Sequence, residues 1–192
     1  MNLNLFFTPT DILLPAHADM RRWSVIACDQ FTADAGYWQA VQDTVCDAPS
    51  TLRLMLPEFY LGKCDEAAAT REIQQTMRRY LDDGVFRTVP HSLVLVQRTL
   101  PGGTVRCGIV GALDLEAYDY APDSVTPIRA TEGTVASRLP ARVRIRAAAA
   151  LEMPHIMVFY SDPEDTIRRE AQAAAGETLY DFDLMSGGGH VR

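Results

Sequence analysis

The chain has 192 residues, with 18 Lys or Arg against 25 Asp or Glu, so its net charge is −7 at pH 7. Hydrophobic residues make up 47% and charged residues 22% of the chain, an ordinary globular composition that excludes disordered, collagen-like and coiled-coil proteins. The length corresponds to one domain of about 150 residues with some excess, and we expect a single domain over residues 1–192. An acidic chain is poorly suited to coating nucleic acid, so we expect no nucleic-acid partner.

Targeting signals and metal signatures are missing from the sequence. No apolar run approaches the roughly 20 residues of a membrane span, and MNLNLFFTPTDILLP lacks the basic region and long apolar core of a secretory signal. We therefore expect a soluble cytoplasmic protein without a membrane partner. No C-x-x-C pair and no histidine at metal-ligand spacing accompanies the four cysteines, which predicts reduced core thiols and no metal site. The four are Cys28, Cys46, Cys64 and Cys107.

Short apolar runs and one helical pattern alternate in the first third of the chain. Residues 23–28 (WSVIAC) have the length and apolar content of a strand. Thr32 is placed to cap a following helix, which the DAPS sequence at 47–50 ends because proline cannot continue it. Residues 51–56 (TLRLML) alternate and predict a second strand. The apolar residues of the helix recur at helical spacing and are Tyr37, Trp38, Val41 and Val45.

The clearest helix pattern covers residues 65–83 and is followed by Gly84, the residue that a left-handed helix cap favours. Its apolar face consists of Ile73, Met77, Tyr80 and Leu81. Residues 92–100 (SLVLVQRTL) and 104–115 (TVRCGIVGALDL) are two strand-like runs separated by Pro-Gly-Gly at 101–103. This turn chemistry predicts an antiparallel β-hairpin.

The last third adds two strand patterns around one helix. Residues 155–160 (HIMVFY) and 178–185 (TLYDFDLM) predict strands, and the DPED sequence at 162–165 predicts the start of a helix that ends near Gly176. The whole order predicts an α+β fold, with a single mixed β-sheet, an antiparallel hairpin and flanking helices. We expect residues 23–28, 92–100, 104–115 and 155–160 to share that sheet.

The segment 128–146 (IRATEGTVASRLPARVRIR) stands out by its charge. It holds five arginines against one acid, Glu132, so it carries +4 while the rest of the chain carries −11. A basic island on an acidic protein concentrates an anion, and arginine binds phosphate and carboxylate groups bidentately. Arg138, Arg142 and Arg146 would share a helix face that Pro140 interrupts. The alternative is that these arginines form surface ion pairs with acids elsewhere.

Within this segment, two hydroxyls, a carboxylate and a glycine occupy residues 131–134. A glycine lets backbone N–H groups approach a phosphate or carboxylate, and Glu132 is suited to act as a general base or to bind a metal. The alternative, that a threonine caps the following helix, does not explain Glu132. We therefore predict Glu132 as the catalytic candidate. The predicted ligand-binding residues are Arg129, Thr131, Gly133, Thr134, Arg138 and Arg142.

Three further candidates are weaker. The SGGGHVR sequence at 186–192 lacks the spacing of a G-x-G-x-x-G or P-loop motif, so a flexible hinge or a strand exit is favoured over an anion cradle. His190 lies beside these glycines, whereas His155 opens an apolar run and is expected to be structural. Cys28 next to Asp29 is a conceivable thiol nucleophile, but a buried thiol is favoured.

Six blocks of the sequence resemble one bacterial and archaeal family, domain of unknown function 1015. The blocks are WSVIACDQFTADAGYW, DAPSTLRLMLPE, VGALDLEAYDY, IRATEGTVASRLPARVRIR, LEMPHIMVFY and YDFDLMSGGGH. They span most of residues 21–190, and the I-R-x-T-E-G-T-V block beginning at Ile128 is the most specific. The resemblance implies a protein about twice as long, of which this chain is the amino-terminal portion.

The same resemblance implies that the later half carries an Asp-Gly-Asn-His-Ser or Asp-Gly-His-His-Arg motif. This motif is similar to those of the ParB and sulfiredoxin-like superfamily, which includes nucleotide-binding proteins and a free-serine kinase. The present chain stops at Arg192, before such a motif.

Three functions remain open from the sequence. The first is an anion- or nucleotide-binding, phosphotransferase-like half-site, because phosphoryl transfer depends mainly on positioning and charge stabilisation. The second is a non-catalytic regulatory module that binds a small anionic metabolite. The third is a structural domain in which the arginines stabilise a homodimer. A downstream Asp-Gly-x-His motif would favour the enzyme over the regulatory module.

Overall fold

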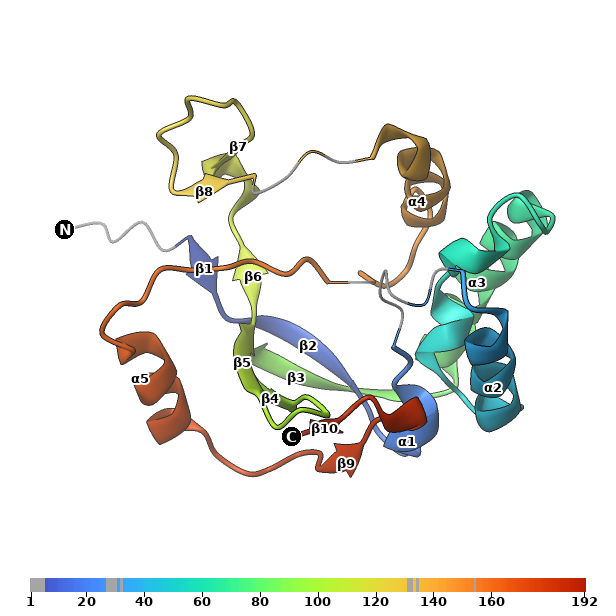
Figure 1. Cartoon of the computed structure of the whole chain (residues 1–192), viewed down its shortest axis with the longest axis horizontal. Helices are drawn as coiled ribbons and strands as arrows, with labels where there is room; N and C mark the ends of the chain where they lie inside the picture. Colours follow the sequence, from blue (N-terminus) through green and yellow to red (C-terminus); the bar gives the residue numbers. More distant parts are fainter. Residues whose placement is uncertain (1–5, 27–30, 32, 131–132, 134, 154) are drawn as a thin grey trace.

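The structure is a computed structural model that describes residues 6–26, 31, 33–130, 133, 135–153 and 155–192 (Figure 1). It combines helices with β-strands, so the predicted α+β class is confirmed. The strands of the described residues form four separate sheets instead of the expected single one. No helix in this part of the chain is both long and apolar enough to cross a membrane.

The largest of these sheets has the strand order β5-β4-β10-β9. The predicted hairpin is confirmed, because β4 and β5 pair antiparallel across the Pro-Gly-Gly turn, from Val94 opposite Val110 to Thr99 opposite Val105. The carboxyl-terminal strand β10 pairs with the other edge of β4, so the end of the chain lies beside the hairpin (Figure 1). The four strands are β4 (Val94–Thr99), β5 (Val105–Val110), β9 (Phe182–Asp183) and β10 (His190–Val191). Of the strand predicted over 178–185, only β9 forms.

A second sheet joins the start of the chain to the strand after the longest helix. In it, β2 (Thr10–Pro15) pairs antiparallel with β3 (Phe86–Ser92). Neither strand is apparent in the sequence, because each contains a proline, which argues against a regular strand. The other two sheets are two-residue pairs. They are β1 (Phe7–Thr8) with β6 (Ala112–Leu113), antiparallel, and β7 (Tyr118–Asp119) with β8 (Ile128–Arg129), parallel.

The strand expected over residues 23–28 is wrong. Trp23 ends the short helix α1 (Met20–Trp23), and residues 24–26 belong to no strand. The Trp23 ring packs edge-on against Phe86 at 5.5 Å between centroids and lies 6.1 Å from Tyr80. The apolar side chains are therefore satisfied by core packing rather than by a sheet. Residues 27–28, with the candidate nucleophile Cys28, lie outside the described residues.

Helix α2 (Ala35–Val45) is confirmed, and its predicted apolar face is buried. Asp34 caps it by accepting a hydrogen bond from the Tyr37 N–H at 2.9 Å, while the expected cap, Thr32, lies outside the described residues. The strand expected over 51–56 is wrong, because Thr51–Leu54 form a 3₁₀ helix. Leu54 is nevertheless buried, so its apolar side chain contributes to the core from a helical turn instead of from a strand.

The longest helix, α3 (Glu66–Asp82), matches its prediction closely. Asp65 caps its first turn by accepting from the N–H groups of residues 67 and 68, each at 3.0 Å. Gly84 follows the helix with φ of +68°, as a left-handed cap requires. Three of the four predicted apolar residues are buried, but Leu81 is exposed.

Two shorter helices lie in the second half of the chain. In α4 (Leu139–Arg146), Pro140 is the second residue, so it lies in the first turn and the expected interruption does not arise. Helix α5 (Thr166–Ala174) follows Asp162, whose carboxylate accepts hydrogen bonds from the N–H groups of residues 166 and 167 at 2.9 and 2.8 Å. The strand expected over 155–160 is wrong, because these residues form no secondary structure and are exposed.

Candidate functional site

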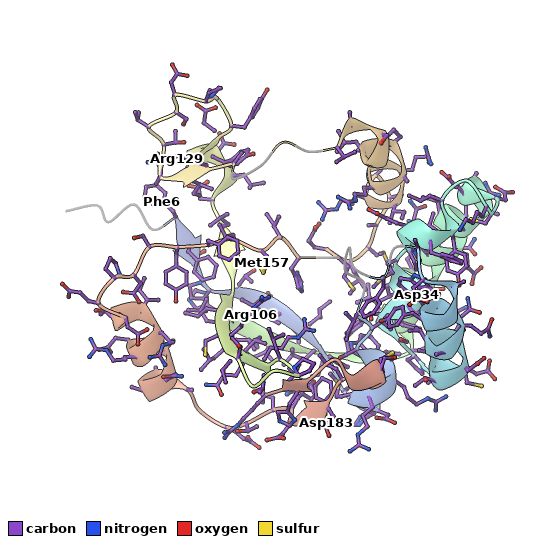
Figure 2. The ribbon with its side chains drawn as sticks, viewed as in Figure 1. Phe6, Asp34, Arg106, Arg129, Met157 and Asp183 are labelled. Carbon is purple, nitrogen blue, oxygen red and sulfur yellow. The ribbon has the colours of Figure 1, made fainter. Side chains whose placement is uncertain are left out.

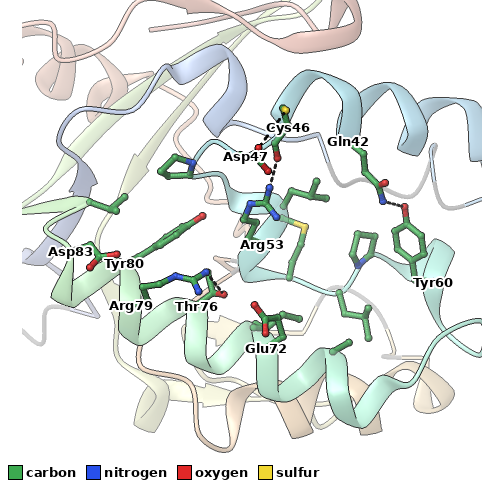
Figure 3. A pocket seen from close by; sticks show the side chains of 18 residues that line it. Gln42, Cys46, Asp47, Arg53, Tyr60, Glu72, Thr76, Arg79, Tyr80 and Asp83 are labelled. Atoms are coloured by element: carbon green, nitrogen blue, oxygen red, sulfur yellow. Dashed lines mark hydrogen bonds between the residues drawn. The ribbon is translucent and has the colours of Figure 1, made fainter.

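A groove of about 860 Å³ lies between α2 and α3 (Figure 3). This volume is within the range of small-molecule sites. Two 3₁₀ helices, Thr51–Leu54 and Glu58–Tyr60, contribute residues between the two walls. The apolar part of the lining consists of Pro49, Leu52, Met55, Leu56, Pro57, Ala69, Ile73 and Val85. The groove therefore offers contact surface for a carbon skeleton.

Two buried clusters hold the walls of this groove in place. One cluster joins α3 to Trp23 and Leu54 through Ile73, Met77 and Tyr80. The other cluster contains the buried face of α2, and Leu52 packs against it. Leu52 and Leu54 belong to the same helical turn. This turn therefore ties the two helices together and sets the width of the groove between them.

Two arginines, Arg53 and Arg79, line the groove (Figure 3). Arg53 donates from Nε to the carbonyl of Ala48 at 3.3 Å and from a terminal nitrogen to the carbonyl of Cys46. Arg79 donates to the Thr76 hydroxyl at 3.1 Å. Among the described residues, neither guanidinium forms an ion pair. Each guanidinium therefore keeps N–H donors that are free to bind a ligand.

Three carboxylates and two phenols, those of Tyr60 and Tyr80, also belong to the polar lining. Asp47, Glu72 and Asp83 face the same groove as the two arginines, so its side chains sum to a net charge of −1. The Tyr80 hydroxyl accepts a hydrogen bond from the Ser50 N–H at 3.1 Å, and its own proton has no acceptor among the described residues. The mixture suits a molecule that carries both an anionic group and hydrogen-bond donors better than a bare anion.

The arginines of α4 are neutralised by acids from other parts of the chain. The ion pairs are Arg142–Glu58 at 3.1 Å, Arg144–Glu66, and Arg146–Glu152 at 2.7 Å. For Arg142, one of the predicted ligand-binding residues, this favours the alternative of a surface ion pair. Such exposed pairs contribute little to stability, and they reduce the positive charge that the sequence suggests.

The other predicted site residues are distributed differently. Arg129 lies in β8, away from α4 (Figures 1 and 2), and its Nε donates to the carbonyl of Thr126 at 3.0 Å. Gly133 is exposed. Thr131, Glu132 and Thr134 lie outside the described residues, as does the side chain of Arg138. The structure thus does not bring Arg129 and Arg142 together, and the role of Glu132 stays a prediction.

The glycine-rich sequence before the carboxyl terminus forms a packed turn between β9 and β10. Gly187 and Gly189 have φ of +65° and +96°, which favours glycine. A Cβ on Gly188 would overlap the Ile26 side chain, and one on Gly189 would overlap the carbonyl oxygen of Thr99. Of the two expected alternatives, the strand exit agrees with this close-packed connection, and the flexible hinge is wrong.

His190, next to this turn, lies between two carboxylates. Its Nδ1 is 2.9 Å from Asp183 and its Nε2 is 3.0 Å from Asp181. The hydrogen bond with Asp183, together with the charges of both carboxylates, raises the pKa of His190 against a smaller opposing effect of burial. Because both ring nitrogens are engaged, this arrangement favours a structural role over general-base catalysis.

The described thiols are free and are not all in the core. Cys46 and Cys64 are exposed and Cys107 is half-buried, so the expectation of core thiols is wrong for the first two. Cys46 also lines the groove, with its sulfur 4.0 Å from a carboxylate oxygen of Asp47. Within the described ranges, no cluster of three His, Cys, Asp or Glu side chains is arranged to hold a metal ion.

The groove arginines are absent from the candidates that the sequence suggests. Arg53 lies inside an apolar run that alternation assigns to a strand, and Arg79 lies on the charged side of a strongly amphipathic helix. The one available indication is that Thr76 and Arg79 are three residues apart and therefore neighbours on that helix.

The fold and the groove define an α+β protein with a ligand-sized groove of mixed polarity. The chain belongs to the family described as protein of unknown function (DUF1015), whose model matches residues 9–192. No curated protein and no solved structure matches the chain.

Proposed function

We propose that this protein binds a small organic anion in the groove between α2 and α3. The observation that carries the proposal is that Arg53 and Arg79 line one groove without a carboxylate partner among the described residues. A guanidinium presents a fixed fork of N–H donors that matches a phosphate or carboxylate group. A phosphate or carboxylate group on the ligand would accept hydrogen bonds from both guanidinium groups and balance their charge.

The remaining lining indicates what else the ligand carries. Asp47, Glu72 and Asp83 accept hydrogen bonds and repel a purely anionic molecule, so the ligand has hydroxyl or amino donors. The apolar side chains of Leu52, Met55 and others cover its carbon skeleton. A phosphorylated or carboxylated metabolite, or a nucleotide, has this combination, whereas inorganic phosphate does not.

Calorimetric titration with inorganic phosphate, glucose 6-phosphate and ATP tests the proposal. We expect one of the organic phosphates to bind more tightly than inorganic phosphate. A charge-assisted contact of this kind contributes about 1.5–3 kcal/mol, so Arg53→Gln and Arg79→Gln each weaken binding about 10- to 150-fold. The control is Arg71→Gln, on the same helix but outside the groove lining. Equal binding by the parent and both groove variants contradicts the proposal.

A phosphotransferase-like half-site in the arginine-rich segment is the second candidate. It is favoured by Arg129, which has a backbone carbonyl but no carboxylate as partner among the described residues. In this proposal Glu132 is the general base and the ligand is a nucleotide. The same titrations with Arg129→Ala and Glu132→Gln distinguish the candidates. Loss of binding in these variants alone would move the site out of the groove.

A further inference from the structure

Two arginines face each other across the β4–β5 hairpin. In its antiparallel register, Arg98 of β4 is directly opposite Arg106 of β5. Opposite residues of an antiparallel pair project from the same face of the sheet, with their Cβ atoms about 4.5–5.5 Å apart. Figure 2 labels Arg106 on this edge strand of the sheet and Asp183 on the other edge strand. Like charges placed directly opposite destabilise a strand pair, so the hairpin carries a repulsion that a bound anion relieves.

No acidic side chain of the described residues compensates these two charges, because neither Arg98 nor Arg106 forms an ion pair with one. Arg98 is half-buried and donates from a terminal nitrogen to the carbonyl of Gly188 at 3.2 Å. Its Nε is buried and has no hydrogen-bond partner in the described part of the chain. A guanidinium that is partly removed from water without a counter-charge is unfavourable. The arginine pair therefore lacks the counter-charge that its position requires.

The sheet face beside the two arginines has room for a ligand. Gly108 is two positions after Arg106 in β5, so it lies on the same face of the sheet. Gly108 is exposed, and a Cβ at this position would meet no atom within 4 Å. The acid of β9 does not fill this space, because Asp183 is in register with His190, which is itself opposite Thr99. Thr99 is the neighbour of Arg98 in β4, so this row projects from the other face.

We propose that Arg98 and Arg106 bind a phosphate group on this face of the sheet, beside Gly108. A phosphate monoester carries about −1.5 to −2 charges at pH 7 and three acceptor oxygens, so one group can accept hydrogen bonds from both guanidinium groups. The anion binds the terminal nitrogens and compensates the charge of Arg98 without having to reach its buried Nε. None of these three residues lines the groove between α2 and α3, so this inference is independent of the groove and of its ligand.

Calorimetric titration of the full chain with inorganic phosphate, at pH 7 and constant ionic strength, tests the site. We expect Arg106→Gln to weaken phosphate binding about 10-fold or more. The matched control is Arg87→Gln, an exposed strand arginine that also has no ion pair among the described residues, and it leaves binding unchanged. Arg53→Gln, in the groove, leaves it unchanged as well. Glycerol 3-phosphate is titrated in parallel, and the tighter of the two ligands shows whether the site takes free phosphate or a phosphate ester.

Thermal unfolding provides the second measurement. Phosphate raises the melting temperature of the parent chain, whereas sodium chloride at the same ionic strength does not. Arg106→Glu places a carboxylate opposite Arg98, so we expect it to melt above the parent without phosphate and to gain nothing when phosphate is added. A parent chain that binds no phosphate, or that chloride stabilises equally, overturns the proposal. So does full phosphate affinity in Arg106→Gln, or a melting temperature of Arg106→Glu below that of the parent without phosphate.

Discussion

Replacing Tyr80 by phenylalanine removes one hydroxyl from the junction between α3 and the turn that follows α2. This hydroxyl accepts a hydrogen bond from the Ser50 N–H at 3.1 Å, and Ser50 is fully buried. In the variant, the N–H loses the one partner that the described residues give it. A buried donor left unsatisfied costs about 1–3 kcal/mol. We therefore expect the free energy of unfolding of Tyr80→Phe to fall by this amount.

Urea unfolding, followed by circular dichroism and without added ligand, measures the loss. The corresponding fall in melting temperature is about 2–12 °C for a chain of this length. The matched control is Tyr60→Phe, because its hydroxyl accepts from the exposed Gln42 side chain and water replaces that contact. We expect the control to change the unfolding free energy by less than about 0.5 kcal/mol. Equal losses in the two variants would refute the importance of the buried Ser50 N–H.

Two further predictions concern the carboxyl-terminal turn. Gly189→Ala requires alanine to adopt a φ of +96° and makes its Cβ overlap the Thr99 carbonyl, so we expect it to lower the free energy of unfolding by at least about 2 kcal/mol. The control is Gly176→Ala, which has open space around its Cβ and should not destabilise the fold. Urea unfolding of both variants measures the difference. The hydrogen bond with Asp183 raises the folded-state pKa of His190 above its ordinary 6.5, so its stabilising contribution is complete below pH 6.5 and is lost as the pH rises through the folded-state pKa. His190→Gln should abolish this part of the pH dependence of unfolding, and an unchanged pH profile would show that the ion pairs do not persist in solution.

Long, regular patterns in the sequence predict their elements correctly. Helix α3 combines an apolar stripe, a capping Asp65 and a terminating Gly84, and all three act within a few residues of one another. The β4–β5 hairpin likewise depends on a short turn between two strand-like runs. Local interactions suffice to specify these elements, and tertiary contacts do not change the conformation that the local sequence favours.

Short apolar runs are ambiguous for a physical reason. Residues 23–28, 51–56 and 155–160 all have the composition of strands, yet none forms one among the described residues. Trp23 and Leu54 are apolar because they fill the core from helical turns. Residues 155–160 are apolar but have no neighbouring strand within the described chain. Apolar content thus indicates that a segment needs a packing partner, and the element that it packs against determines whether it becomes a strand or a helical turn.

The α+β class, the charge of the arginine-rich segment and the amphipathic faces of α2 and α3 follow from local sequence patterns. Which arginines remain free of ion pairs depends instead on how distant parts of the chain pack together. Arg142 and Arg144 form ion pairs with Glu58 and Glu66, which lie about 80 residues earlier in the chain. Arg53 and Arg79 meet in one groove because Leu52 and Leu54 lock two separate clusters together. Ion pairing and groove formation both depend on contacts distant in sequence, which no local pattern encodes.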